Sequence, residues 1–151
     1  MEGYLRWGLI PHFCEKRPDF APIHARAETV AENEWFSDAY RKRRCVVPMN
    51  SFFQEDSSGK RYAIPRQDGE PIGVAGIWEN PRDPLTSEWE RTFAVITVPA
   101  NGIIARINNR MLAILPTEQF PRWLSEEMDP HELLLPFPSN SLAIKLQRSR
   151  R

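Results

Sequence analysis

Short apolar segments rich in β-branched residues recur along this chain, and they restrict it to a fold dominated by β-strands. Such segments occupy residues 61–64, 72–78, 92–98 and 111–115, and the turn residues 56–59 (DSSG) make the first of them a hairpin partner. Helical patterns between them are short and irregular, so the regular alternation of strand and helix that builds a doubly wound sheet is missing. The sequence therefore predicts an α+β fold, with a curved, barrel-like sheet of antiparallel or mixed strands and short flanking helices.

The length of the chain fits one domain with its own core. It has 151 residues, of which 41% are hydrophobic, and both values are typical of a folded globular protein. The two cysteines, Cys14 and Cys45, cannot form a disulfide framework, and no targeting or membrane-spanning segment is visible. We expect a single domain over residues 1–151 in the reducing cytoplasm.

Further local signals lie in the first half of the chain. Residues 4–11 predict a buried strand and residues 45–53 a central strand. Thr29 and Glu32 have the spacing of a capping box, which predicts a helix behind them, over residues 30–40. The basic residues 41–44 (RKRR) would then lie at the C-terminus of this helix, where the dipole favours cations. A solvated helix end is therefore favoured over a nucleic-acid patch for this basic run.

Four short motifs follow one another along the chain. They are residues 6–11 (RWGLIP), 23–29 (IHARAET), 44–48 (RCVVP) running into 51–55 (SFFQE), and 106–111 (RINNRM). As a set, they resemble motifs of the SRAP family, the SOS response-associated peptidases or abasic-site processing proteins. The resemblance runs from about residue 4 to about residue 136, and residues 137–151 form a divergent C-terminal tail.

The resemblance implies a specific chemistry. Family members bind single-stranded DNA, or its junction with duplex DNA, at an abasic site. An N-terminal cysteine, exposed when the initiator methionine is removed, adds its amine and its thiol to the sugar aldehyde and forms a thiazolidine crosslink. The same amine is thought to release the initiator segment, which explains the word peptidase. An asparagine, a glutamate and a histidine within the motifs orient the nucleophile and move protons.

This chain differs from the family at each of these catalytic positions. Position 2 holds Glu2 instead of cysteine, and the segment that the family carries before the RWGLIP motif is absent. The asparagine position holds His24, the glutamate position Gln54 and the histidine position Asn108. Gln54 has no basic carboxylate, and Asn108 cannot exchange a proton near neutral pH. We therefore expect a protein that is shortened at its N-terminus and impaired in crosslinking.

Four positions that the resemblance implies in DNA binding keep suitable residues. Arg26 and Arg110 match arginines that contact phosphates in relatives, and Trp7 matches an aromatic residue near the base-stacking surface. Thr97 is expected to add a hydrogen bond to a phosphate. Structural roles stay open for three of them: Trp7 in the core, Arg26 in an ion pair with Glu28 or another carboxylate, and Arg110 in an ion pair.

The expected partner is single-stranded DNA or a junction, with no cofactor, no metal and no membrane. A net charge of zero, from 20 basic and 20 acidic residues, gives no overall nucleic-acid signature but is compatible with a local basic groove. His12, Cys14, His24 and Cys45 lack the paired spacing of a zinc site. Two alternatives remain open. One is an active crosslinking, lyase or autopeptidase enzyme that uses a different start or other residues, and the other is a non-catalytic phage or mobile-element remnant that acts in protein interaction. An exposed sheet edge also predicts a homodimer.

Overall fold

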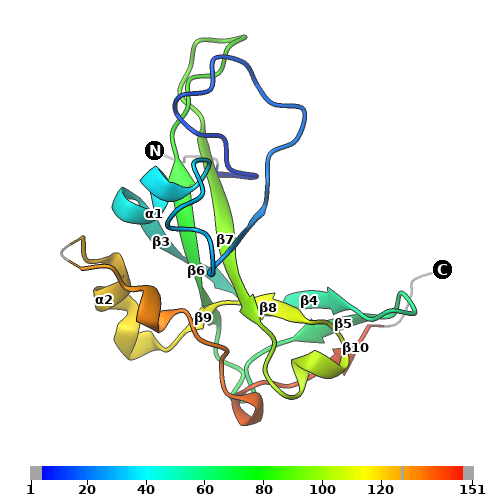
Figure 1. Cartoon of the computed structure of the whole chain (residues 1–151). Helices are drawn as coiled ribbons and strands as arrows, with labels where there is room; N and C mark the ends of the chain where they lie inside the picture. Colours follow the sequence, from blue (N-terminus) through cyan, green and yellow to red (C-terminus); the bar gives the residue numbers. More distant parts are fainter. Residues whose placement is uncertain (1–4, 127, 148–151) are drawn as a thin grey trace.

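Two long antiparallel strands form the centre of the structure. The computed structural model describes residues 5–126 and 128–147. Strands β6 (Ile72–Glu79) and β7 (Arg91–Pro99) pair in the middle of a seven-stranded sheet and rise through Figure 1 as its tallest feature. Nearly every residue of β6 is buried, and most residues of β7 are buried too. Continuous apolar runs of this kind are expected where a strand is covered on both faces.

Shorter strands complete this sheet along both long strands. Two of them run parallel to β7 and follow each other along one of its edges, and the others pair antiparallel with β7 or β6. These shorter strands are β1 (Leu5–Trp7), β2 (His24–Arg26), β3 (Arg44–Met49), β8 (Arg110–Leu112) and β9 (Ile114–Leu115). The parallel pairing with β7 brings the first and second sequence motifs onto one strand that lies far along the chain.

A second, three-stranded sheet lies beside the first. It consists of the hairpin β4 (Phe52–Glu55) and β5 (Arg61–Ile64), with β10 (Lys145–Leu146) paired to the far edge of β5. In Figure 1 this sheet extends to the right of the central strands. The predicted turn at residues 56–59 and its hairpin are confirmed. The segment that begins at residue 137 contributes Phe137 and Leu142 to the common core.

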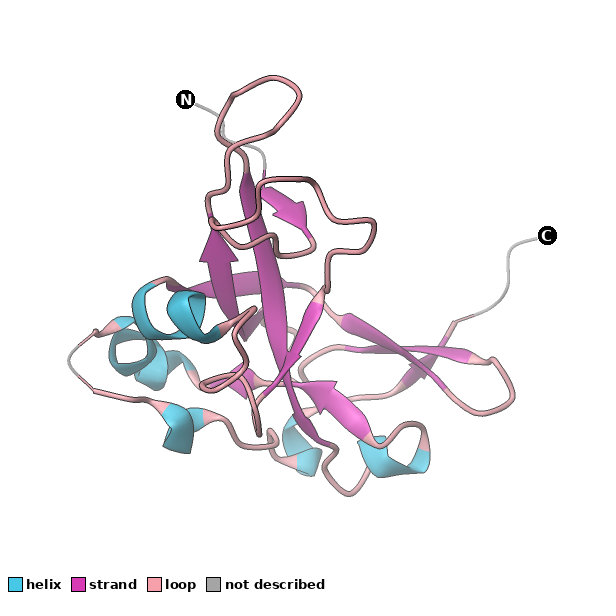
Figure 2. Cartoon of the chain, turned by 45° about the horizontal axis from the view of Figure 1, so that its top comes forward, coloured by secondary structure: helices cyan, strands magenta, loops and turns pink. Residues whose placement is uncertain are grey.

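The two α-helices lie on the other side of the molecule, and short 3-10 turns are placed around it. Figure 2 shows α1 and α2 on the side away from the β4–β5 hairpin. The helices are α1 (Ser37–Lys42), α2 (Phe120–Leu124) and the 3-10 turns η1 (Ile104–Arg106), η2 (Thr117–Gln119), η3 (His131–Leu133) and η4 (Ser139–Ser141). The fully buried Trp123 of α2 anchors its helix by donating a hydrogen bond from its indole to the carbonyl of Cys45 in β3. The helices therefore close the core against the sheet.

The predicted α+β class with a mixed, mostly antiparallel sheet is confirmed, and two local predictions are wrong. Among the described strands, the path β1–β7–β6–β3 does not close on itself, so the sheet is open and not barrel-like. Residues 4–11 do not form one buried strand: β1 is exposed throughout, and the buried residues Leu9 and Ile10 follow it in a loop. Residues 45–53 belong to two strands, and β3 lies at the end of the sheet path instead of its centre.

The helix predicted over residues 30–40 is also wrong. Residues 27–32 form turns, and the helix begins only at Ser37, with no side-chain cap. The side chain of Asn33 accepts a hydrogen bond from the backbone amide of Trp35, at 2.8 Å, and the Trp35 indole donates to the carbonyl of Leu9, at 2.9 Å. Local bonds of this type offer the backbone an alternative to the helix. The hydrogen bond from Trp35 to Leu9 of the RWGLIP motif therefore fixes this segment as turns, although the sequence has the spacing of a capping box.

Candidate functional site

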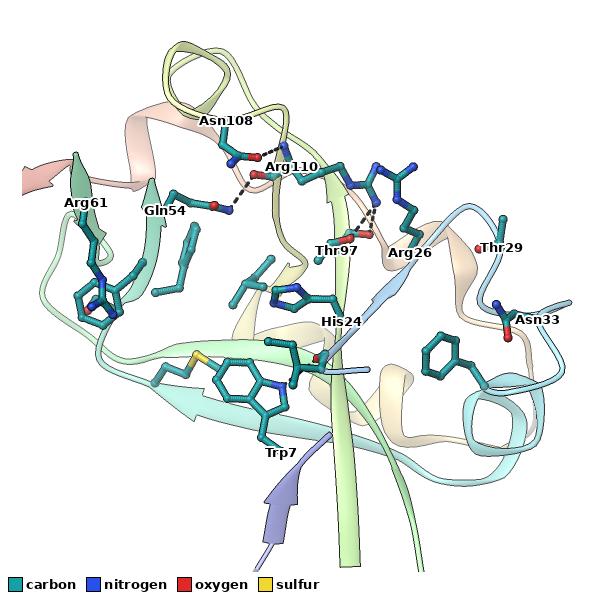
Figure 3. A pocket seen from close by; sticks show the side chains of 17 residues that line it. Trp7, His24, Arg26, Thr29, Asn33, Gln54, Arg61, Thr97, Asn108 and Arg110 are labelled. Atoms are coloured by element: carbon teal, nitrogen blue, oxygen red, sulfur yellow. Dashed lines mark hydrogen bonds between the residues drawn. The ribbon is translucent and has the colours of Figure 1, made fainter. Parts of the chain in front are cut away.

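An open cleft of about 870 Å³ lies where the strands of the large sheet meet the β4–β5 hairpin. All the site residues predicted from the motifs line it, although they come from five strands and one loop. These residues are Trp7, His24, Arg26, Gln54, Thr97, Asn108 and Arg110. Figure 3 shows their side chains around one cavity. The structure thus brings together seven positions that are spread over more than two thirds of the sequence, from Trp7 to Arg110.

Trp7 forms part of the cleft wall and is not a core residue. Its indole stacks on Phe93, with ring centroids 5.9 Å apart, and donates a hydrogen bond to the carbonyl of Ile23 at 2.8 Å. The side chain is still 44% exposed. Gly8, which follows it, has a φ of 126°, and a Cβ there would lie 3.1 Å from the backbone oxygen of Ala21. Glycine is therefore required at the bend that turns the chain away behind Trp7.

His24 lies between the two ends of the cleft in Figure 3. Its ring meets the edge of Trp7 at a centroid distance of 6.1 Å. The side chain is open to the cleft, but the surrounding protein atoms desolvate the ring and lower the pKa of His24 below its usual value. Near neutral pH the imidazole is therefore uncharged, with one nitrogen able to accept a hydrogen bond. Among the described lining residues it is the one histidine, and it offers a neutral imidazole to the cleft.

The two predicted phosphate-binding arginines differ in their surroundings. Arg110 bonds both carboxylate oxygens of Glu28 and also donates to the backbone and hydroxyl oxygens of Thr97, both at 2.9 Å. The structural ion pair left open for Arg110 is thus present. The side chain of Arg26, in contrast, is exposed, and its guanidinium has no hydrogen bond or ion pair to any described residue, although its charge helps to lower the pKa of Glu28. Its guanidinium is free to bind an anion in the cleft.

Thr97 is poorly placed to contact a ligand directly. The residue is buried, and its hydroxyl oxygen accepts a hydrogen bond from Arg110. Its backbone carbonyl serves the same guanidinium. Thr97 therefore holds Arg110 in position along the cleft wall, and its phosphate-binding role stays a prediction.

Gln54 and Asn108 are fixed by hydrogen bonds to backbone groups of the β8 region. The amide nitrogen of Gln54 donates to the carbonyl of Arg110 at 2.9 Å. The amide oxygen of Asn108 accepts from the backbone N–H of Arg110 at 3.0 Å, which closes a local turn before β8. The first contact requires the amide of Gln54, because an ionised glutamate cannot donate this bond. Each side chain thus has a structural task at a position that the family resemblance implies in catalysis.

The motifs did not identify a further pair of cleft residues, Arg61 and Phe53. The guanidinium carbon of Arg61 lies 4.1 Å above the centre of the Phe53 ring. Phe53 belongs to the SFFQE motif, and Arg61 faces it across the predicted hairpin, one residue from the partner of Gln54. The hairpin signal was therefore visible in the sequence, but its position beside the cleft depends on the tertiary fold.

The other candidate ligands and nucleophiles lie outside the cleft. Neither Cys14 nor Cys45 lines it, and burial raises the pKa of the Cys45 thiol to about 11. Within the described part of the chain, no group of three or more His, Cys, Asp or Glu side chains is placed to hold a metal ion. Position 2, where the resemblance implies a cysteine, and the C-terminal arginines Arg148, Arg150 and Arg151 lie outside the described residues.

The cleft is suited to binding an anionic ligand that also carries flat, unstacked rings. Its described lining includes Arg26, Arg61 and Arg110 but no aspartate or glutamate, and no lysine or cysteine. The exposed rings of Trp7 and Phe53 provide apolar faces along its wall. Arginine forks bind phosphate oxygens, and aromatic faces stack on bases.

No described helix of the chain is long and apolar enough to cross a membrane.

Comparison with known proteins gives this geometry a family context. The family described as SOS response associated peptidase (SRAP) matches residues 2–147. The abasic site processing protein YobE of Bacillus subtilis is 30% identical over 149 residues, which cover 93% of this chain and 68% of YobE. YoqW of the Bacillus phage SPbeta, also an abasic site processing protein, is 30% identical, over 93% of this chain and 66% of YoqW.

Solved structures agree with this relationship. A protein from Bacteroides thetaiotaomicron has a TM-score of 0.88 and 29% sequence identity, over 94% of this chain and 67% of that one. A protein from Bordetella bronchiseptica has a TM-score of 0.86 and 26% identity, over 95% of this chain and 76% of that one. This chain thus spans about two thirds of the length of most of these relatives. The predicted resemblance is confirmed, and the chain belongs to the SOS response-associated peptidase (SRAP) family.

Proposed function

We propose that this chain binds single-stranded DNA, or its junction with duplex DNA, at abasic sites, and that it does so without forming a stable covalent crosslink. The names of its relatives, abasic site processing proteins, support this class of substrate. A role in the SOS response to DNA damage is part of the same proposal.

The observation that carries the binding proposal is the composition of the cleft. Three arginines and two exposed aromatic rings line it, and although Glu28 pairs with Arg110, the guanidinium groups of Arg26 and Arg61 have no ion pair with a described carboxylate. The overall charge of the chain is zero, so this local excess of positive charge is not a general property of its surface. An unpaired strand offers both phosphates for the arginines and bare base faces for the rings.

The proposed loss of crosslinking rests on the three substituted positions and not on how the chain begins. Gln54 and Asn108 replace the glutamate and histidine that the family resemblance implies, and both are occupied by bonds to the backbone of Arg110. Neither amide exchanges protons near neutral pH. His24 supplies a neutral imidazole, but the described cleft lining has no amine or thiol beside it to form a covalent adduct.

Fluorescence anisotropy with labelled single-stranded oligonucleotides, with and without an abasic site, tests the binding proposal. The logarithm of affinity should fall linearly with the logarithm of salt concentration, by about 0.7 per phosphate neutralised. Arg26→Ala should weaken binding roughly tenfold and make this slope shallower by about 0.7. Arg91→Ala is the matched control, because Arg91 is an exposed arginine outside the cleft. Absence of binding at low salt contradicts the proposal.

Denaturing gel electrophoresis after incubation with abasic DNA tests the covalent half. We expect no crosslinked band from this chain, nor from a Glu2→Cys variant that exposes a cysteine once the initiator methionine is removed. The Glu2→Cys variant separates the effect of the substituted cleft residues on crosslinking from the effect of lacking a cysteine at position 2. A heat-stable band from Glu2→Cys alone would show that Gln54 and Asn108 support the reaction.

The homodimer expected from an exposed sheet edge remains part of the proposal. Among the described strands β1 pairs with β7 alone, and all three of its residues are exposed. A second copy could pair with its open edge. Size-exclusion chromatography with light scattering decides this point, because a monomeric mass at every protein concentration contradicts it.

A further inference from the structure

Two stacked side chains of the β4–β5 hairpin, Arg61 and Phe53, line the cleft on the side across from Arg26. In Figure 3, Arg61 lies at one end of the cavity and Arg26 lies across from it, with His24 between them and Thr29 and Asn33 beyond Arg26. Arg61 lies over the face of Phe53, with 4.1 Å between the guanidinium carbon and the ring centre. The ring is 48% exposed although it is a large apolar group. Its exposed position next to a cationic side chain calls for an explanation beyond core packing.

The guanidinium of Arg61 is available for a ligand. It has no hydrogen bond or ion pair to any described residue, even though Glu55 is its direct partner across the hairpin. Stacking on Phe53 uses the face of the guanidinium and leaves the N–H donors along its edge free. A phosphate can therefore bond these donors while the stack persists, and the exposed apolar surface can support a base.

The hairpin holds this pair in place before any ligand arrives. One oxygen of Asp56 accepts bonds from the backbone N–H groups of Ser58 and Lys60, and the other accepts from the hydroxyl of Tyr62. These bonds, led by one from the Ser58 hydroxyl, lower the pKa of Asp56 to about 2, so the turn is intact at neutral pH. On the other edge of β5, the carbonyl of Arg61 accepts from the backbone of Gln147 at 2.9 Å. A rigid site loses less entropy on binding.

Charge in the cleft is concentrated at its two ends. Glu28 forms its ion pair with Arg110 and only a longer-range electrostatic interaction with Arg26, so Arg26 and Arg61 are the cleft arginines without a direct ion pair to a described carboxylate. One isolated phosphate can satisfy either of them, but a ligand with repeated phosphates can satisfy both. A nucleic-acid strand that crosses the cleft past His24 has this property.

We infer that Arg61 and Phe53 form a second nucleotide-binding site, which binds one phosphate and stacks one base of a single strand that runs across the cleft from Arg26. This inference rests on the proposed DNA-binding function and adds a site to it. It also gives the cleft a minimum ligand length, because a strand too short to reach both ends can use only one of the two arginines.

Anisotropy titrations with oligothymidylates of increasing length test the inference. For long strands, Arg61→Ala should weaken binding roughly tenfold and make the salt slope shallower by about 0.7, as expected for one lost phosphate. Arg61→Lys should keep the salt slope but lose part of the affinity, because lysine keeps the charge without the planar stack. Phe53→Leu should likewise leave the slope unchanged and weaken binding severalfold.

Strand length separates the two ends of the cleft. The wild-type affinity should rise steeply once the strand reaches both arginines, and Arg61→Ala should remove this rise while leaving the affinity for the shortest strands nearly unchanged. Arg91→Ala is again the control, because Arg91 also stacks on an aromatic residue, Trp78 at 5.6 Å, but outside the cleft.

Each outcome decides between the two proposals. If Arg26→Ala weakens binding and Arg61→Ala and Phe53→Leu bind like the wild type, the second site is wrong and the DNA-binding function stands. If the wild type binds no oligonucleotide at low salt, both proposals fall together. Both side chains are exposed, so circular dichroism and thermal unfolding should show that the variants remain folded.

Discussion

Arg110 donates hydrogen bonds to both carboxylate oxygens of Glu28, from Nη1 at 2.7 Å and from Nη2 at 3.1 Å. The arginine is largely buried, with 17% of its side chain exposed, whereas Glu28 is 47% exposed. Glu28 therefore occupies the guanidinium fork of Arg110, which is the part of the side chain that a phosphate would need. The ion pair holds Arg110 in place and at the same time cancels its charge.

Replacing Glu28 should change stability and DNA binding in opposite directions. Glu28→Gln removes the ion pair, so the free energy of unfolding should fall by about 0.5–1 kcal/mol, a small value because the pair is partly solvated. The uncompensated Arg110 then adds to the positive charge of the cleft. Affinity for single-stranded DNA should rise about threefold, and the salt slope should steepen by up to about 0.7.

Urea unfolding and anisotropy, run on the same Glu28→Gln preparation, check both effects. Glu88→Gln provides a control, because Glu88 lies in the exposed loop between β6 and β7, away from the cleft. If Glu28→Gln weakens DNA binding, then Glu28 holds Arg110 in a productive position and does not compete with the phosphate.

The same pair predicts a specific acid sensitivity. The hydrogen bonds from Arg110, assisted by its positive charge, lower the pKa of Glu28 below the usual carboxyl value. A carboxyl whose folded-state pKa is lowered stabilises the protein above its unfolded value, about 4.3, and loses this contribution as the pH falls through the folded value. Between about pH 6 and pH 3 the wild type should therefore lose more stability than Glu28→Gln. Urea denaturation at intervals across this range measures the difference, and parallel curves contradict it.

Patterns between neighbours in the sequence predicted much of the fold correctly. The apolar runs of β6 and β7 and the turn before β5 are set by local composition, and they appear where the sequence places them. We also predicted that Arg26 and Gln54 lie in the same cleft. This prediction came from the family resemblance and not from their spacing along the chain. Their strands lie in different sheets, and nothing local indicates that those sheets meet at a cleft.

The basic run of residues 41–44 shows why local patterns were not sufficient elsewhere. Arg41 pairs with Asp38 at the end of α1, as a solvated helix end would. Arg43, however, binds the buried Glu79 of β6, and Arg44 donates to the carbonyls of Trp123 and Tyr40. Glu79 and Trp123 are distant in sequence from this run, so a tract of four like charges cannot reveal which members are structural. Arg61 escaped prediction for the same reason, because its role depends on what the hairpin packs beside.

The contact between Gln54 and Arg110 predicts how a glutamate would behave at this position. In Gln54→Glu an ionised carboxylate would face the carbonyl oxygen of Arg110, which now accepts a hydrogen bond at 2.9 Å. A protonated carboxyl can still donate, so the pKa of the new group should be raised. Stability should then be best preserved at about pH 5 and decline by about 1–2 kcal/mol as the pH rises to about 8.

Urea unfolding of Gln54→Glu at these two pH values tests this. The control is Gln54→Met, which removes the same hydrogen bond without adding a titratable group, and its deficit relative to the wild type should not change with pH. A Gln54→Glu protein as stable as the wild type at high pH would mean that the side chain leaves Arg110 and turns into the cleft.

The close packing of α2 on β6 depends on Gly73. A Cβ at this position would overlap the ring of Phe120 and lie 3.0 Å from the side chain of Val46, so the ring packs directly on the glycine backbone. Gly73→Ala should lower the free energy of unfolding by about 1–3 kcal/mol, the usual cost of overpacking a core. Because the overlap is with a single ring, Phe120→Leu should relieve part of it. In a double-mutant cycle, the combined variant should be at least about 1 kcal/mol more stable than the sum of the single effects predicts. Additive effects would place the strain of Gly73→Ala against Val46 or the β6 backbone, and not against α2.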